Sequence, residues 1–232
     1  MAQPLEGIRV VELAQGVAGS YAGKLLADYG ADVIKVEPPG GDRVRGLGPF
    51  PENANEDREL GALHLHLNTN KRSVIGRPGE ALVARLIAGA DVVLQSEPSP
   101  SPEELREDHP GLVVVTVTSF GLTGPLAGRR GEEIVHYAYG GPMSATGDPE
   151  REPLKMGGEL GHYQCGTIAA VAALAALAFT AKCGEGVHVD LSNVETQIAS
   201  IDRRMTYLLY AAYRGEDVPR QGGYNVSPFP GG

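Results

Sequence analysis

Two short apolar segments flank a helix-like segment near the start of the chain. Residues 8–13 and 32–36 are apolar and rich in β-branched side chains, as expected of strands buried on both faces. Between them, residues 16–29 carry apolar side chains at helical spacing, and Gly30 suits the end of a helix. A strand, a helix and a second strand in this order form a right-handed crossover onto a parallel sheet. The pattern therefore predicts an α/β fold.

Later segments extend this pattern. We expect further strands at residues 91–94, 112–118 and 187–191, because each is short, apolar and β-branched. In residues 62–67, apolar side chains alternate with His64 and His66, and this alternation also predicts a strand. Helical spacing or end signals predict helices over residues 80–88, 103–107, 131–139 and 192–213, the last of them capped by Ser192.

A glycine-rich run leads into an alanine-rich segment near the middle of the chain. Residues 167–181 hold eight alanines and no charge, which predicts a buried central helix that is too short to be a membrane span. The preceding run contains Glu159 and His162, two titratable side chains beside backbone N–H groups that are free to face a ligand. The alternative is a tight turn followed by an ordinary helix cap.

Charge and cysteine content exclude several classes of function. A formal charge of −9 leaves no basic excess for a nucleic-acid partner. Cys165 and Cys183 lie on one predicted helix, about 27 Å apart at 1.5 Å per residue, and cannot pair. The cysteines and scattered histidines show no metal-ligand spacing, so we expect no metal site. Residues 2–6 include a polar and an acidic side chain and no apolar leader follows, which favours a reduced, cytoplasmic setting without a membrane anchor.

Two loops are candidates for binding phosphate. The turn at residues 14–19 resembles a dinucleotide-binding turn, but it lacks the G-x-G-x-x-G spacing, which argues against a nicotinamide cofactor. Further along, Asn70, Lys71 and Arg72 place an amide beside two adjacent cations, which suits a phosphate group. A solvated turn is the alternative interpretation of that second loop.

Five segments together resemble one protein family. They are LEGIRVVEL (5–13), LLADYGADVIKVEP (25–38), NTNKRS (68–73), GLTGP (121–125) and GEGVHVD (184–190). In this order they resemble family III CoA-transferases, the group that also includes 2-methylacyl-CoA racemases. The resemblance implies a Rossmann-like parallel sheet with flanking helices, acyl-CoA and a carboxylic acid as substrates, no tightly bound cofactor, and an interlocked homodimer. It also implies that CoA contacts Gly16, Val17 and Ala18 in the first turn, together with Asn70, Lys71 and Arg72.

The resemblance fails at the position that matters most for catalysis. Such transferases carry a nucleophilic Asp before the central helix, and an ungapped count from Gly184 places His162 there. Glu159 is the nearest carboxylate, so Glu159 and His162 are the candidate catalytic residues. The racemase histidine position holds Glu132, and the family's CoA-contacting Glu-Asn-Phe-x-Pro-Gly segment is replaced by residues 95–100.

The relatives continue well beyond the segment that matches residues 225–229. We therefore expect a family fold that is incomplete at its C-terminus. Residues 1–190 would form most of the large domain, and residues 191–232 a long helix and linker toward a small domain. Three functions stay open: CoA transfer with Glu159 in place of the Asp, a catalytically degenerate domain that binds CoA or forms a dimer with a second chain or domain, and racemase-type proton transfer.

Overall fold

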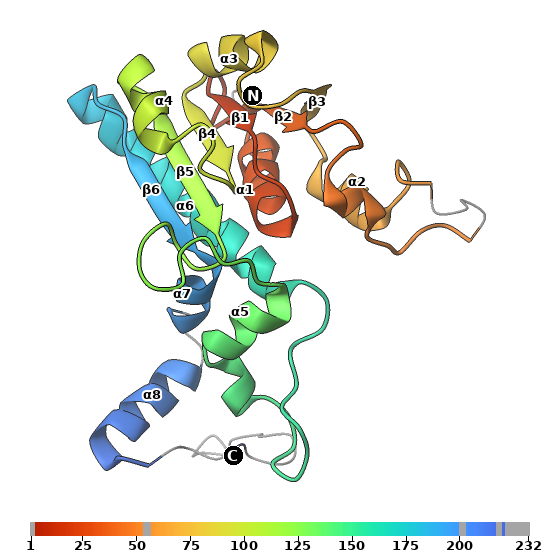
Figure 1. Cartoon of the computed structure of the whole chain (residues 1–232), viewed down its shortest axis with the longest axis vertical. Coiled ribbons are helices and arrows are strands. Elements are labelled where there is room, and N and C mark those ends of the chain that lie inside the picture. The colour runs from red at the N-terminus through yellow and green to blue at the C-terminus, as the bar shows by residue number, and fades with distance from the viewer. Residues whose placement is uncertain (1–2, 53–56, 200–202, 217–219, 221–232) are drawn as a thin grey trace.

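The computed structural model describes residues 3–52, 57–199, 203–216 and 220 of the chain. At its centre is a six-stranded sheet, in which all the paired strands are parallel, in the order β3-β2-β1-β4-β5-β6 (Figure 1). The strands are β1 (Arg9–Glu12), β2 (Asp32–Glu37), β3 (Arg72–Ile75), β4 (Val92–Gln95), β5 (Val113–Thr118) and β6 (His188–Ser192). The predicted α/β fold with a parallel sheet is confirmed.

Helices cover both faces of the sheet. On one face, α1 (Val17–Asp28) and α6 (Leu160–Cys183) enclose a core of valine, leucine and alanine side chains. On the other face, α3 (Ala81–Ala88) and α4 (Pro102–Asp108) pack over a second apolar cluster. The helix α5 (Glu133–Tyr139) and the short α7 (Asn193–Ile198) lie beyond the carboxyl ends of the strands (Figure 1).

One predicted strand is a helix. Residues Ala62–Leu67 form α2, not the strand that their alternating pattern predicted. The buried side chains are His64 and Leu67, three positions apart, which is the spacing of a helix face. Six residues are too few for periodicity to separate the two structures. The strand β3 was not predicted, because its side chains are mostly exposed and the segment lacks an apolar run.

The central helix is longer and more exposed than predicted. It has 24 residues, and its buried positions form one stripe of mainly small side chains against α1 and the sheet. On other positions, Val171 and Phe179 are 60% and 47% exposed, so the prediction of a helix buried all round is wrong for this chain. With a mean hydropathy of 1.7, the helix is long and apolar enough to span a membrane. The prediction that it is too short for a membrane span is therefore wrong.

The last predicted helix is divided in two. Ser192 caps α7, its hydroxyl accepting the Glu195 N–H at 3.2 Å, as the sequence predicted. The helix α7 ends at Ile198, and a separate helix, α8, covers Arg203–Arg214. Cys165 is buried and Cys183 is exposed, and both are free, as their separation along α6 requires.

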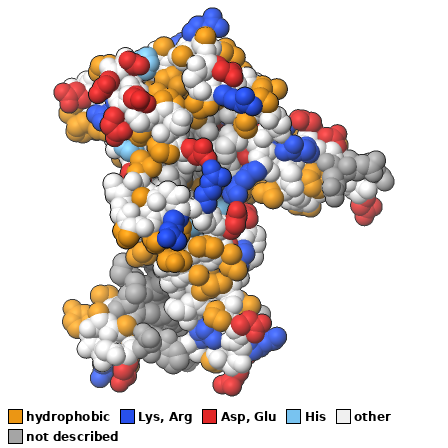
Figure 2. Space-filling model, in the orientation of Figure 1, with side chains coloured by type: hydrophobic (Ala, Val, Ile, Leu, Met, Phe, Trp, Pro, Cys, Tyr) orange, Lys and Arg blue, Asp and Glu red, His pale blue; other side chains and the backbone are white. Residues whose placement is uncertain are grey.

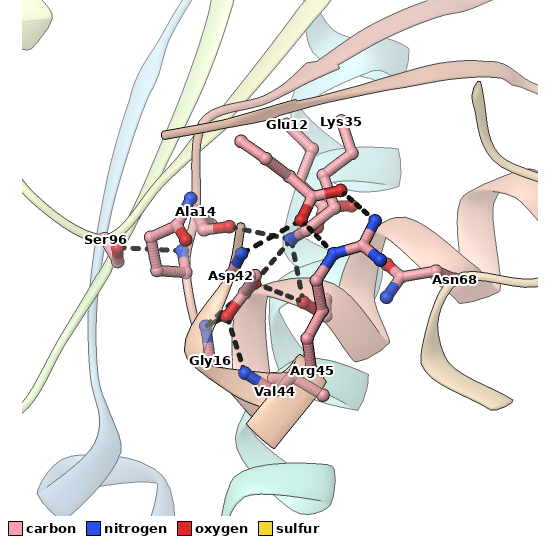
Figure 3. Close-up of polar contacts among 12 residues, drawn as sticks. Glu12, Ala14, Gly16, Lys35, Asp42, Val44, Arg45, Asn68 and Ser96 are labelled. Carbon is pink, nitrogen blue, oxygen red and sulfur yellow. Dashed lines mark hydrogen bonds and ion pairs between the residues drawn. The ribbon is translucent and has the colours of Figure 1, made fainter. Parts of the chain in front are cut away.

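A buried network of charges joins the first turn to the loop after β2 (Figure 3). The Lys35 ammonium lies 2.6 Å from a Glu12 oxygen and 2.7 Å from an Asp42 oxygen. Asp42 also accepts the backbone N–H of Gly16 at 3.1 Å, which fixes the start of α1. The Lys71 ammonium lies 2.8 Å from the second Glu12 oxygen, so two cations face two carboxylates.

Close packing of α1 on α6 depends on Gly166. A Cβ at this position would lie 2.5 Å from the Ala18 carbonyl oxygen and 3.0 Å from the Tyr21 Cβ. We predict that Gly166→Val lowers the free energy of unfolding by about 3 kcal/mol, because the helix backbones must separate. Ala175→Val, at an exposed position of the same helix, is the control and should cost less than about 1 kcal/mol. Urea unfolding measures both, and equal losses would contradict this packing.

Candidate active site

A cavity lies at the carboxyl ends of the strands, where the connections from β1 and β4 leave in opposite directions. In a parallel α/β sheet this switch point is the usual ligand site. The switch-point cavity has a volume of about 270 Å³. Its walls come from the turn after β1, the ends of β4 and β5, and the starts of α1, α5, α6 and α7: Gln15, Val17, Ala18, Gly19, Arg43, Ser96, Glu97, Val117, Thr118, Ser119, Arg130, Gly131, Glu132, His136, His162 and Asn193.

The two candidate catalytic residues are neighbours, but only one lines this cavity. Glu159 and His162 are one helical turn apart at the start of α6, and the Glu159 Oε2 lies 2.6 Å from the His162 Nδ1. The His162 side chain is 5% exposed and forms part of the cavity wall. Glu159 is one third exposed and lies behind His162, outside the residues that line the cavity.

A second histidine, which the sequence did not single out, continues this contact. His136 Nδ1 lies 3.2 Å from His162 Nε2, so Glu159, His162 and His136 form a chain of three side chains. His136 is 3% exposed, and the edge of Phe120 packs on it. Burial, followed by the neighbouring His162, lowers the pKa of His136 to about 4.

The start of α6 is anchored to α5 by Glu133. Its buried carboxylate accepts the Gly161 N–H at 3.0 Å and pairs with the Lys155 ammonium at 2.9 Å. Gly161 immediately precedes His162, so this contact fixes the backbone that carries the imidazole.

Comparison with known proteins decides the family. A family model described as CoA-transferase family III matches residues 5–229. The chain belongs to CoA-transferase family III. The succinate–glutarate CoA-transferase of Agrobacterium fabrum is 38% identical over 97% of this chain and 60% of its own length. A succinyl-CoA–D-citramalate CoA-transferase of Chloroflexus aurantiacus is 38% identical over 86% of this chain and 52% of its own length.

A solved family structure confirms the fold. A CAIB/BAIF family protein from Brucella suis superposes with a TM-score of 0.86 at 33% identity, over 96% of this chain and 61% of that protein. The chain therefore spans about half to three fifths of the length of the relatives it matches.

The first turn, which the resemblance implied would contact CoA, lies beside the cavity. Val17 and Ala18 line the cavity, and Gly16 precedes them with a φ of 82°, a conformation that favours glycine. The Gly16 N–H donates to Asp42, so it is not free for a ligand. That these residues contact CoA stays a prediction.

The second predicted CoA segment lies apart from this cavity. The Lys71 ammonium is buried and contacts Glu12 and the Ser20 carbonyl oxygen, and burial lowers its pKa to about 8. Asn70 donates to Asp28 at 2.8 Å, and the Arg72 guanidinium pairs with Asp32 on the surface. None of the three lines the switch-point cavity, and their role in CoA binding stays a prediction.

Other arginines surround the cavities, and the sequence did not single them out. At the switch-point cavity, Arg43 lies 3.4 Å from Glu132 and Arg130 lies 3.0 Å from Glu97, all on exposed side chains. A second cavity of about 490 Å³, which includes Arg77, shares three lining residues with the first. Figure 2 shows basic and acidic side chains interspersed near the middle of the molecule.

The buried His136 makes stability depend on pH. Its pKa is about 4 in the folded protein against 6.5 for an unperturbed histidine, so the unfolded chain binds more protons between these values. The contribution of His136 to the free energy of unfolding is therefore fully present above pH 6.5 and is lost as the pH falls from 6.5 to 4. Between pH 7 and pH 5, we predict that the free energy of unfolding falls by about 2 kcal/mol less in His136→Leu than in the wild-type protein. Urea unfolding at the two pH values measures this difference. Parallel losses in the two proteins would show that His136 is not desolvated.

Proposed function

We propose that the chain is the CoA-binding part of an enzyme that transfers CoA between an acyl-CoA and a carboxylic acid. The observation that carries the proposal is the Glu159–His162 contact of 2.6 Å, in which His162 lines the switch-point cavity and Glu159 adjoins it. The family resemblance implies a reactive carboxylate at the start of this helix, which supports the proposal. Glu159 is the carboxylate nearest to that position, and His162 holds it by a hydrogen bond.

The chemistry that we propose uses Glu159 as the nucleophile. A Glu159 oxygen attacks the thioester carbonyl, the C–S bond breaks, and CoA leaves as a thiolate, so an acyl anhydride forms on the side chain. The thiolate then attacks the Glu159 carbonyl carbon, which releases the first acid and leaves CoA on Glu159 as a thioester. The second acid reverses these steps. One third of the Glu159 side chain is exposed, so it is not sealed inside the protein.

The adjoining cavities suit a long, anionic ligand. We propose that the thioester end of CoA occupies the switch-point cavity and that its nucleotide occupies the second cavity, where Arg77 is a partner for phosphate. Arg43 and Arg130 border the first cavity and would bind the carboxylate of the acid. The matched relatives are named for succinyl-CoA and dicarboxylic acids, so we propose a dicarboxylic acid as the acceptor.

A partner chain or domain belongs to this proposal. Val171 and Phe179 expose apolar surface on α6, and the chain covers 60% of the Agrobacterium relative. A Chloroflexus relative is named as an alpha subunit. We propose that a second copy, or a related domain or subunit, covers this surface.

A non-catalytic, CoA-binding domain is the second candidate. It is favoured by one observation, which is that an imidazole and not a carboxylate lines the cavity at the family's nucleophile position. A racemase is not favoured, because Glu132 occupies the family's histidine position and pairs with Arg43 at the cavity wall.

The two candidates are separated by trapping the covalent intermediate. The protein is incubated with succinyl-CoA, treated with hydroxylamine, and examined by intact mass and peptide mapping. We predict an adduct on Glu159, and a fall in kcat on the order of a thousandfold in Glu159→Gln, because the amide cannot attack the thioester. Glu152→Gln, an exposed change nearby, is the control and should leave kcat unchanged.

Full activity of Glu159→Gln would contradict the assignment of the nucleophile. Retained CoA binding with no adduct and no turnover in the wild-type protein would support the non-catalytic candidate.

A further inference from the structure

The contacts in the chain Glu159–His162–His136 restrict where the ring protons lie. A carboxylate oxygen only accepts hydrogen bonds, so the 2.6 Å contact requires a proton on His162 Nδ1. In the tautomer with its proton on Nδ1, His162 carries a lone pair on Nε2, which accepts from the partner 3.2 Å away, His136 Nδ1. His136 must in turn carry its proton on Nδ1, leaving its own Nε2 bare.

The environment of His136 favours this arrangement over the reverse. Within the part of the chain that the structure describes, His136 Nε2 is buried and has no hydrogen-bond partner. A proton there would be an orphaned buried donor, which is rarer in proteins than an unpaired acceptor. Burial also lowers the pKa of His136 to about 4, so this ring holds a single proton at pH 7.

The charged side chains near His136 have other partners. Glu133 pairs with Lys155 and accepts the Gly161 N–H, and Glu132 lies 3.4 Å from Arg43. Phe120 packs on the His136 ring in a T-shaped contact. Glu159 therefore holds one nitrogen of the His162 ring, and His136 is the partner that holds the other.

We propose that His136 is a positioning residue whose Nδ1–H, donated to His162 Nε2, holds the His162 ring so that its own Nδ1–H is directed at Glu159. This inference deepens the proposed function and rests on it for its catalytic consequence. The tautomer of a histidine is set by the hydrogen bond that its other nitrogen makes, and here that bond comes from a second imidazole.

The directed N–H has a role in the proposed reaction. When the thiolate attacks the Glu159 carbonyl carbon, an S–C bond forms and the carbonyl electron pair moves onto the oxygen that faces His162. The His162 N–H stabilises that negative charge, as a donor in an oxyanion hole does. The pair returns as the C–O bond to the first acid breaks, and the acid leaves as a carboxylate.

The ring protons are measured directly by NMR on 15N-histidine-labelled protein without substrate. We predict a proton on Nδ1 of both rings and a hydrogen bond from His136 Nδ1 to His162 Nε2, and the exposed His66 is the internal reference. His136→Asn keeps an N–H donor near the original Nδ1 position, and His136→Leu removes it. We predict that the Asn variant keeps the hydrogen bond to His162 Nε2, whereas the Leu variant loses it and the 15N signal of His162 Nε2 shifts.

Steady-state kinetics give the second measurement. We predict that His136→Leu lowers kcat for CoA transfer on the order of tenfold with KM unchanged, as expected for one hydrogen bond, and that His136→Asn recovers most of it. A proton on Nε2 of His136 or an imidazolium at His162 in the wild-type protein would overturn the inference. An unchanged His162 Nε2 signal in the Leu variant would overturn it equally. Absence of CoA transfer in the wild-type protein would contradict the proposed function alone, because the tautomers are measured without turnover.

Discussion

Four buried charged side chains hold the first strand–helix turn against the loop that follows β2. Glu12 and Asp42 face Lys35 and Lys71, and Asp42 also binds the Gly16 N–H. Each charge is desolvated, so the arrangement is tolerable only because the two signs balance and hydrogen bonds complete the set. Removing one member would leave an uncompensated buried charge, at a cost of about 3–5 kcal/mol. The walls of the switch-point cavity on the α1 side depend on this network.

On the α6 side, the wall of the switch-point cavity depends on packing and not on the buried charge network. Small residues along α6 let it lie against α1, and Gly166 removes the side chain that would separate them. This approach brings the first turn of α6, with His162, to the carboxyl ends of the strands. Glu133 then fixes the same turn from α5. The chemistry proposed for Glu159 and His162 therefore follows from one close helix contact and one buried hydrogen bond.

Much of the fold was predictable from the sequence, because buried parallel strands are continuous apolar runs and the helices between them have clear ends. The exceptions were short or exposed segments: Ala62–Leu67 is a helix and Arg72–Ile75 is an edge strand. Lys71 was a candidate for binding phosphate because it adjoins another cation. The sequence could not show that the chain turns at Asn70, with a φ of 64°, and buries the Lys71 ammonium against Glu12.

The candidate site was only partly predictable. Glu159 and His162 are one helical turn apart, so their contact follows from local spacing. His136 is 26 positions away from His162, and only the packing of α5 on α6 brings the two rings together. The arginines at the cavities lie on three different loops, and no sequence spacing connects them. Long-range contacts of this kind leave no local pattern to detect.

The most direct measurement is a structure of the protein with CoA bound. The predicted result places the CoA sulfur in the switch-point cavity, in contact with His162 and next to Glu159, with the nucleotide in the second cavity beside Arg77. CoA bound at another surface, with His162 and both cavities free of ligand, would contradict the central claim.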